Sequence, residues 1–140
     1  MASSDHARTE AAILRANAAF YRAFSQGDHV SMGELWALQA PVTCFHPLAP
    51  VLVGRRAVLA SWRDILREAP PFELRCDRPM VHVFDGMAIV TCYEGNADHP
   101  AHLAATNVFV LEGGHWRMVH HQAGPLSEPV PRSVPPSAVN

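Results

Sequence analysis

Several signatures of common functional classes are missing from the sequence. It has no GxGxxG, Walker or GxSxG motif, so nothing in it supports a nucleotide cofactor or a hydrolase triad. Its three cysteines are an odd number without CxxC spacing, which indicates reduced thiols rather than a disulfide framework. No apolar run approaches the ~20 residues that span a bilayer, and residues 1–10 are too polar for a signal peptide. These absences predict a cytoplasmic protein without a membrane partner.

Charge is also scarce. Only 17% of the residues are charged, the formal net charge is -2, and the eleven Lys+Arg residues are spread along the chain. A nucleic-acid-binding protein usually carries a basic face, so we expect no nucleic-acid partner. Apolar residues make up 49% of the 140 residues, which is typical of a single globular domain with a large core.

The first half of the chain has helical periodicity. Residues 9–25 are predicted to form a helix that ends at Gly27, and Asp28 can cap a short second helix. A strand is expected at residues 42–46, because β-branched and aromatic residues are concentrated there. A third helix is expected after Gly54, with Val58, Leu59, Trp62, Ile65 and Leu66 as its buried stripe.

The second half changes to the alternation of β-strands. Segments 81–84 and 88–93 flank Asp85-Gly86, and segments 104–111 and 115–121 flank Gly113-Gly114, so two hairpins are predicted. Residues 125–140 contain five prolines and no apolar period, so we take residues 1–124 as the domain and 125–140 as a flexible tail. The alternative is that this tail lies across a partner subunit.

Helices followed by long strands are typical of an α+β fold. We predict a curved antiparallel sheet wrapped around the helices, a cone-shaped α+β barrel that the first and third helices close at one side. The outer sheet face needs cover for its apolar residues, and a homodimer through that face is the commonest solution.

Certain segments, taken in order, resemble one family. They are Gly27-Asp28 with Leu35-Trp36, residues 42–47, residues 54–62, residues 90–94 and residues 116–122. Together they resemble the SnoaL-like, ketosteroid-isomerase-like domains of the nuclear transport factor 2-like superfamily, a resemblance that implies a cystatin-like fold. Because that superfamily holds isomerases, cyclases, dehydratases and members without chemistry, the resemblance implies the fold more firmly than the function.

The resemblance draws attention to His46 as a catalytic candidate. Ketosteroid-isomerase-like enzymes carry an aspartate base at this position, before the proline that ends the first strand. A histidine can also move protons near neutral pH, although a structural histidine at the mouth of a pocket remains the alternative. The residues that stabilise the oxyanion in ketosteroid isomerase are not matched here. Phe20 and Asn107 stand at the positions where that enzyme has a tyrosine and a neutral carboxylic acid.

Asn107 and His121 complete the predicted site. Adjacent strand residues point to opposite faces, and the resemblance places Val119 and His121 inside the cone and His120 outside. We therefore expect His46, Asn107 and His121 to converge with Tyr93 or Thr91 on a ligand; the alternative is that they satisfy one another or hold a buried water. The remaining lining residues of the predicted pocket are Phe20, Cys44, Trp62, Phe109 and Val119.

Neither a metal nor a cofactor is expected. His99 and His102 form a loop pair, but four well-spaced ligands are the mark of a structural zinc site. The Arg55-Arg56 pair is expected to be solvated rather than anion-binding.

Two functions remain open on the sequence. One is a homodimer that binds a small, mostly apolar molecule and performs cofactor-free proton transfer of the isomerase, dehydratase or cyclase type. The other is a non-catalytic dimerisation or accessory module. An enzyme predicts a pocket of several hundred Å³ with His46 in its wall, whereas a module predicts an interior filled by Trp and Phe side chains.

Overall fold

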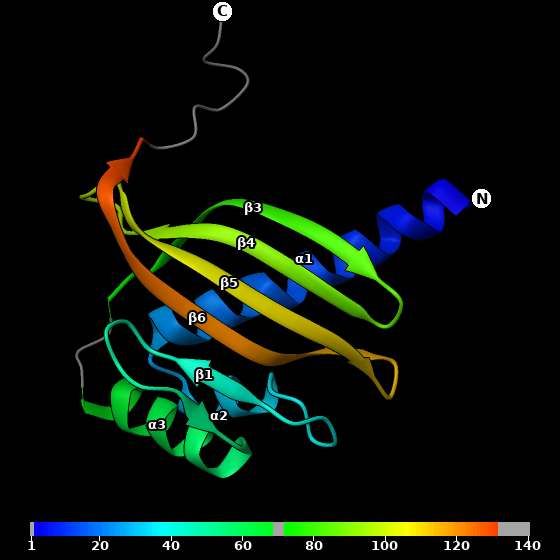
Figure 1. Cartoon of the computed structure of the whole chain (residues 1–140), viewed down its shortest axis with the longest axis horizontal. Helices are drawn as coiled ribbons and strands as arrows, with labels where there is room; N and C mark the ends of the chain where they lie inside the picture. The colour runs from blue at the N-terminus through cyan, green and yellow to red at the C-terminus, as the bar shows by residue number, and fades with distance from the viewer. Residues whose placement is uncertain (1, 69–71, 132–140) are drawn as a thin grey trace, which may run out of the picture.

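The computed structural model describes residues 2–68 and 72–131. These residues form three helices and six strands (Figure 1). The elements are α1 (Ala2–Gln26), α2 (His29–Glu34), β1 (Thr43–Phe45), β2 (Leu52–Val53), α3 (Arg55–Glu68), β3 (Arg75–Phe84), β4 (Met87–Gly95), β5 (Ala101–Glu112) and β6 (His115–Val130). The long strands form a curved sheet, and α1 crosses one face of it. The predicted α+β architecture is therefore confirmed.

The strands lie in the order β2-β1-β6-β5-β4-β3. The predicted curved sheet is confirmed; it is unclosed, with β2 and β3 at its edges. Neighbouring strands are antiparallel except β1 and β6, which run parallel, with Cys44 opposite His121. No hairpin joins β1 to β6, so no turn signal in the sequence indicates their relative direction.

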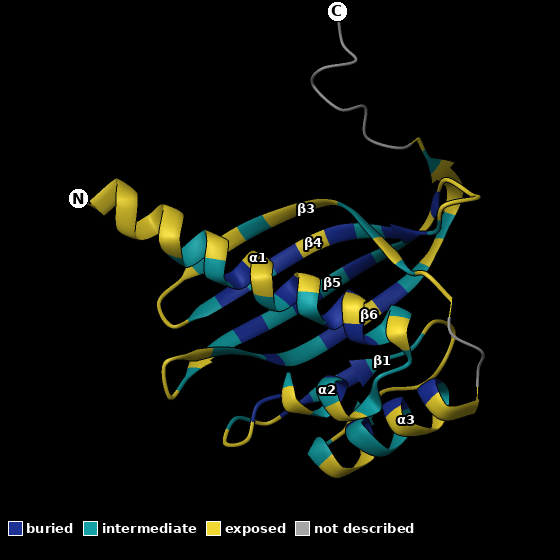
Figure 2. Ribbon diagram, turned by 180° about the vertical axis from the view of Figure 1, so that it is seen from behind, coloured by how far each residue is buried: buried dark blue, intermediate teal, exposed yellow. Residues whose placement is uncertain are grey.

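Local capping signals define the first helices. Gly27 adopts a positive φ of 65°, and the following backbone N–H, that of Asp28, donates to the Ala23 carbonyl at 2.9 Å. The Asp28 side chain then accepts from Ser31 N at 3.1 Å and caps α2. Helix α1 begins earlier than predicted, at Ala2, and its first turns are exposed (Figure 2). Residues 2–8 are mostly polar, so the apolar periodicity that predicts the helix does not extend over them.

Both predicted hairpins are present. The β3–β4 turn passes through Gly86, and the β5–β6 turn passes through Gly113 and Gly114, all with positive φ. Asn107 pairs with His121, but the register of β5 and β6 shifts between Val108 and Phe109. Val108 pairs with His120 and Phe109 pairs with Met118, so β6 has one additional residue, Val119, at this bulge.

Strand β6 corrects the predicted tail. It continues to Val130, and Pro125 and Val130 pair with Leu103 and Ala101 of β5. Prolines 125 and 129 do not prevent this, because a proline at an irregular part of a strand need not donate to the ladder. Residues 125–130 thus belong to the domain, Pro131 follows the strand, and residues 132–140 of the predicted tail lie outside the described residues.

Apolar side chains from both layers form the core between the helices and the inner face of the sheet. The largest fully buried residues are Ile13, Phe20, Met32, Trp36, Phe109 and Met118. None of the helices in the described part of the chain combines the length and apolarity that a membrane crossing requires.

Candidate functional site

A cavity of about 210 Å³ lies between α1, α3 and the inner face of the sheet. Its polar wall residues are His46, Glu94 and His121, which come from the end of β1, from β4 and from β6. The rest of the wall is apolar: Phe20, Phe24, Pro47, Trp62, Ile65, Phe72, Leu74, Leu103 and Ala123. The cavity is smaller than expected, and His46 lies in its wall.

His46 lies at the α3 side of the cavity. Its Nε2 is 2.7 Å from Ser61 Oγ, and its ring packs edge-to-face on Trp62 with 4.7 Å between ring centroids. Burial lowers the pKa of His46 below its ordinary value of 6.5, because the charged imidazolium loses hydration. The ring is therefore neutral at neutral pH and has a partner that holds its orientation.

His121 is buried and packs against Phe20, with 4.8 Å between ring centroids. Its Nδ1 lies 2.6 Å from Asn107 Oδ1. Burial, with smaller effects from His46 and His120, lowers the pKa of His121 to about 3. Because Asn107 Oδ1 can only accept, the neutral ring carries its proton on Nδ1, and Nε2 is left with a lone pair.

Asn107 connects His121 to a buried polar network rather than to the cavity. Its Nδ2 donates to Asn17 Oδ1 at 2.8 Å and to the Tyr21 hydroxyl at 3.1 Å. The Tyr21 hydroxyl donates in turn to Glu94 Oε2 at 2.7 Å and also contacts Cys92 Sγ at 3.1 Å. Hydrogen bonds thus link the two inward-facing groups, His121 and Glu94, through Asn107 and Tyr21.

The carboxyl of Glu94 titrates near neutral pH. Its side chain is 2% exposed, and burial raises its pKa from 4.5 to about 7, against the opposing effect of the hydrogen bond from Tyr21. Burial and the nearby Glu94 charge also raise the pKa of Tyr21, so its hydroxyl stays protonated and acts as a donor.

Two polar atoms of this site are left without a partner. Among the described residues, neither Glu94 Oε1 nor His121 Nε2 has a hydrogen bond. The fully enclosed side-chain atoms that lack a partner there are Trp36 Nε1 and Trp62 Nε1. Glu94 Oε1 and His121 Nε2 are not among those enclosed atoms, and both residues line the cavity.

The structure brings together only part of the predicted site. His46, His121, Phe20 and Trp62 line the cavity as expected. Asn107 is 0% exposed and supports His121 from behind, so it is a positioning residue rather than a donor to a ligand. The His121 proton lies on the ring nitrogen that faces Asn107, so the other ring nitrogen, Nε2, is an acceptor.

Four predicted lining residues do not line this cavity. Cys44 and Phe109 are core residues, 0% and 1% exposed, and burial raises the pKa of the Cys44 thiol to about 12. Val119 is the additional residue of the β6 bulge, so Met118 takes the inward position that simple alternation assigns to Val119.

Tyr93, the fourth of these residues, lies on the opposite sheet face. Val90, Cys92 and Glu94 are the buried, inward positions of β4, so Thr91 and Tyr93 point outward. Those two residues line a separate hollow with Met80 and Thr106. The same alternation identifies Glu94 as inward-facing, a signal that our sequence analysis missed together with Asn17 and Tyr21.

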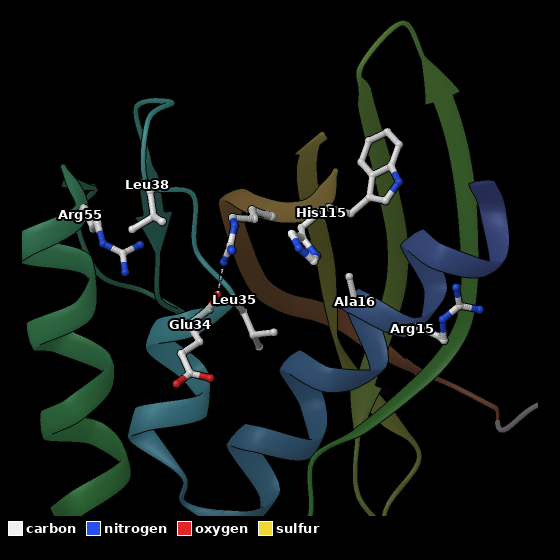
Figure 3. Close-up of a pocket in the computed structure, with 9 residues that line it drawn as sticks. Arg15, Ala16, Glu34, Leu35, Leu38, Arg55 and His115 are labelled. Carbon is white, nitrogen blue, oxygen red and sulfur yellow. Dashed lines mark hydrogen bonds between the residues drawn. The ribbon is translucent and has the colours of Figure 1, made fainter. Parts of the chain in front are cut away.

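A larger groove of about 600 Å³ lies between α1, α2 and the β5–β6 hairpin (Figure 3). Arg55 and Arg117 line it, but their guanidinium groups are bound to backbone carbonyls. Arg117 donates to Glu34 O at 2.6 Å, and Arg55 donates to the carbonyls of Gly33, Trp36 and Ala37. The predicted solvated role of Arg55 is therefore wrong, since it ties α3 to the segment after α2.

No group of three or more His, Cys, Asp or Glu side chains is arranged to hold a metal ion within the described residues. His99 lies in the β4–β5 loop but His102 lies in β5, and this pair has no third ligand of these types in that part of the chain.

Comparison with known proteins shows the family. The model of the SnoaL-like domain matches residues 13–128, and the chain belongs to this family. An F-box protein, SKIP8 of Arabidopsis thaliana, is 28% identical over 116 residues, which are 82% of this chain and 50% of that protein. The chain thus spans about half the length of the curated relative that it matches.

Solved structures share the fold. A candidate dehydratase of the NTF2-like family from Streptomyces avermitilis is 30% identical, with a TM-score of 0.76 over 84% of this chain and 95% of that one. A candidate calcium/calmodulin-dependent protein kinase type II association domain from Thiobacillus denitrificans is 36% identical, with a TM-score of 0.67 over 80% and 93%. A candidate ketosteroid isomerase from Parabacteroides distasonis, 16% identical with a TM-score of 0.65 over 82% and 86%, shares the fold.

Proposed function

We propose that the protein binds a small, mostly apolar molecule in the His46–His121 cavity and transfers a proton on it without a cofactor. The observation that carries the proposal is the pair of neutral imidazoles, which lie against Trp62 in an otherwise largely apolar wall. Polar groups in an apolar cavity orient a ligand and exchange protons with it.

His46 is the base in this proposal. Its lowered pKa keeps it unprotonated at neutral pH, and Ser61 holds the ring in place. The lone pair of His121 Nε2 accepts a hydrogen bond from a hydroxyl of the substrate, while Asn107 fixes the His121 tautomer. In a dehydration, His46 removes a proton from carbon, the C–H electron pair forms a double bond, and the C–O bond breaks. The departing hydroxide takes this proton from the His46 imidazolium and leaves as water, so that His46 is neutral again.

The size of the cavity limits the substrate. Sites for drug-sized ligands enclose ~300–1,000 Å³, and this cavity encloses about 210 Å³. A molecule with one ring is the appropriate size, whereas a four-ring steroid is not. The 30% identity to a candidate dehydratase supports an elimination or isomerisation over other reaction types.

A thermal-shift screen of one-ring ketones, alcohols and amines tests the binding. A compound at a hundredfold above its Kd is expected to stabilise the wild type by ~2.7 kcal/mol. His46→Gln removes the base, and His99→Gln makes the same change in an exposed loop. The compounds that bind are then incubated in deuterium oxide, and exchange of carbon-bound protons is followed by NMR. Exchange that needs His46 but not His99 supports the proposal, and equal exchange by all three proteins contradicts it.

An association module is the second candidate, favoured by the 36% identity to a candidate association domain. The outward sheet face carries Met80, 59% exposed, beside the hollow that Tyr93 lines. We propose that a homodimer forms through this face. Sedimentation should show a dimer that Tyr93→Glu dissociates, whereas a monomeric wild type contradicts this arrangement.

Cys44, Cys76 and Cys92 are free thiols, which supports the cytoplasmic location that we also propose.

A further inference from the structure

Glu94 is a buried carboxyl without a cationic partner. It forms no ion pair within residues 2–68 and 72–131, and its one hydrogen-bond donor is the neutral hydroxyl of Tyr21. The sequence has no lysine, and no arginine lies among the residues that line the cavity. A buried carboxylate is normally paired, because the loss of hydration is unfavourable unless another charge offsets it.

The two polar atoms at the cavity that lack a partner are both hydrogen-bond acceptors. Glu94 Oε1 accepts hydrogen bonds when the carboxyl is ionised, and His121 Nε2 accepts because Nδ1 holds the ring proton. The Tyr21 donor is already directed at Glu94 Oε2 and the Asn107 donors at Asn17 and Tyr21. The network therefore supplies acceptors to the cavity and keeps its donors inside the protein.

Aromatic rings form much of the remaining wall. Phe20 packs edge-to-face on Trp62 at 5.4 Å, and Phe24 packs edge-to-face on Trp62 at 6.0 Å. Phe72 extends this cluster through a contact with Phe24 at 5.5 Å. Aromatic surroundings favour organic cations over anions, because the π face of each ring carries partial negative charge.

We propose that the cavity binds a small organic cation, a protonated primary amine on a single ring, whose ammonium group is held by Glu94. The inference rests on the proposed small-molecule function and adds the charge of the ligand to it. The ammonium group supplies the cation that Glu94 lacks, and the ring lies in the cavity against the aromatic wall that Phe20, Phe24 and Trp62 form. An anionic ligand of the same size is excluded, because the wall offers it no cation and an ionisable carboxyl repels it.

Three compounds of one shape test the charge directly. Benzylamine, benzyl alcohol and benzoate differ in the group that reaches Glu94, and isothermal titration calorimetry at pH 8 measures each affinity. We expect benzylamine to bind at least tenfold more tightly than benzyl alcohol, and benzoate not to bind. Equal or tighter binding of benzyl alcohol would overturn the inference.

The pH dependence adds a readout on the wild-type protein alone. An aliphatic amine stays protonated up to about pH 10. Around Glu94, the pKa values of His46 and His121 are lowered below 6.5 and that of Tyr21 is raised, so a change in affinity between pH 6.5 and 8 reports the ionisation of Glu94. With the Glu94 pKa raised to about 7, the benzylamine affinity should fall about tenfold per pH unit below pH 7. Binding below pH 7 should also release a proton, detected as a dependence of the measured heat on the buffer. An affinity independent of pH overturns the inference.

Glu94→Gln keeps the size of the side chain and an acceptor for Tyr21 but removes the charge. Benzylamine should bind at least tenfold more weakly to this variant, without pH dependence, whereas Glu128→Gln on the exposed part of β6 should bind like the wild type. If benzylamine binds through Glu94 but no compound exchanges carbon-bound protons, the inference stands and the catalytic proposal fails. If benzyl alcohol binds at least as tightly as benzylamine, and Glu94→Gln weakens neither compound, the inference fails and the small-molecule site stands. If none of the three compounds binds, both are overturned.

Discussion

The two ends of the interior are built differently. At one end, Trp36, Phe109 and Met118 are at most 1% exposed, and backbone bonds join both neighbours of Trp36 to Met118, at 2.8 and 2.9 Å. At the other end, His46 and His121 lie beside the cavity, and Asn107 and Tyr21 connect His121 to Glu94.

This difference separates stability from function. A filled core gains dispersion and hydrophobic free energy from every contact, whereas an unfilled cavity forgoes part of that gain. Buried ionisable groups with shifted pKa values add a further unfavourable contribution, and such groups cluster at functional sites. The cavity end therefore has the features of a ligand site, and the packed end has the features of a core.

The largest effect is expected at the packed end. Phe109→Ala should lower the free energy of unfolding by ~3–5 kcal/mol, because it removes a buried ring and leaves a cavity. Urea denaturation measures the loss, and Phe84→Ala, at a side chain 52% exposed, is the control that should change little. Similar losses in the two variants would show that the packed end is not the stabilising region.

The next effect is a pH dependence at the cavity end. The folded-state pKa of Glu94, about 7, exceeds its ordinary 4.5, so the native state binds more protons between these values and stability falls as pH rises through them. A shift of this size corresponds to about 3 kcal/mol. His46 and His121, with lowered pKa values, act oppositely and lose stability as pH falls below 6.5.

The difference in free energy of unfolding between Glu94→Gln and wild type, taken at each pH, cancels the contribution of the histidines. This free energy should rise for the variant relative to the wild type by up to ~3 kcal/mol as pH rises from 4.5 to 8. Urea denaturation at a series of pH values measures this, and a constant difference would mean that Glu94 titrates as it does in the unfolded chain.

Asn107→Ala should have a smaller effect on stability and a specific effect on His121. It leaves the His121 Nδ1–H and the Asn17 Oδ1 without their partner, which costs ~1–3 kcal/mol in a buried setting. NMR of the imidazole nitrogens should show His121 losing its single tautomer. A His121 ring that keeps the proton on Nδ1 would show that Asn107 does not position it.

The smallest expected change in stability comes from filling the cavity. Ala123→Val adds two methyl-sized groups to a wall residue that is 4% exposed. We expect stability to change by less than ~1 kcal/mol, since the hydrophobic gain of ~0.8 kcal/mol per buried CH₂ is offset by local strain. Benzylamine binding should be lost. A variant that binds as the wild type does would place the ligand elsewhere.

The elements that sequence predicts correctly are those with local signals. Gly27 and Asp28 mark a helix end and a cap, and Gly86 and Gly113 mark hairpin turns, so neighbouring residues alone determine these features. The parallel pairing of β1 with β6 and the extension of β6 to Val130 depend on distant partners, which local periodicity does not reveal.

The site could be predicted only in part for the same reason. The positions of His46 and His121 both follow from the family resemblance, whereas strand alternation shows only that His120 and His121 point to opposite faces. Val119 was placed on the inner face by regular alternation along β6, which the bulge breaks. Tyr93 was also placed inside, although β4 alternates regularly, with Cys92 and Glu94 inward and Tyr93 outward. The hydrogen bond between the Tyr21 hydroxyl and Glu94 depends on how α1 packs against β4, which a single sequence does not show.

The central claim is that the cavity beside His46 and His121 binds a small molecule. Long-range ¹H–¹⁵N NMR spectra resolve the imidazole signals during a titration of wild-type protein with benzylamine, and with benzyl alcohol as a neutral ligand. The account predicts that the His46 and His121 ring signals shift with saturation while those of the exposed His99 do not. Unchanged His46 and His121 signals with both compounds would contradict it.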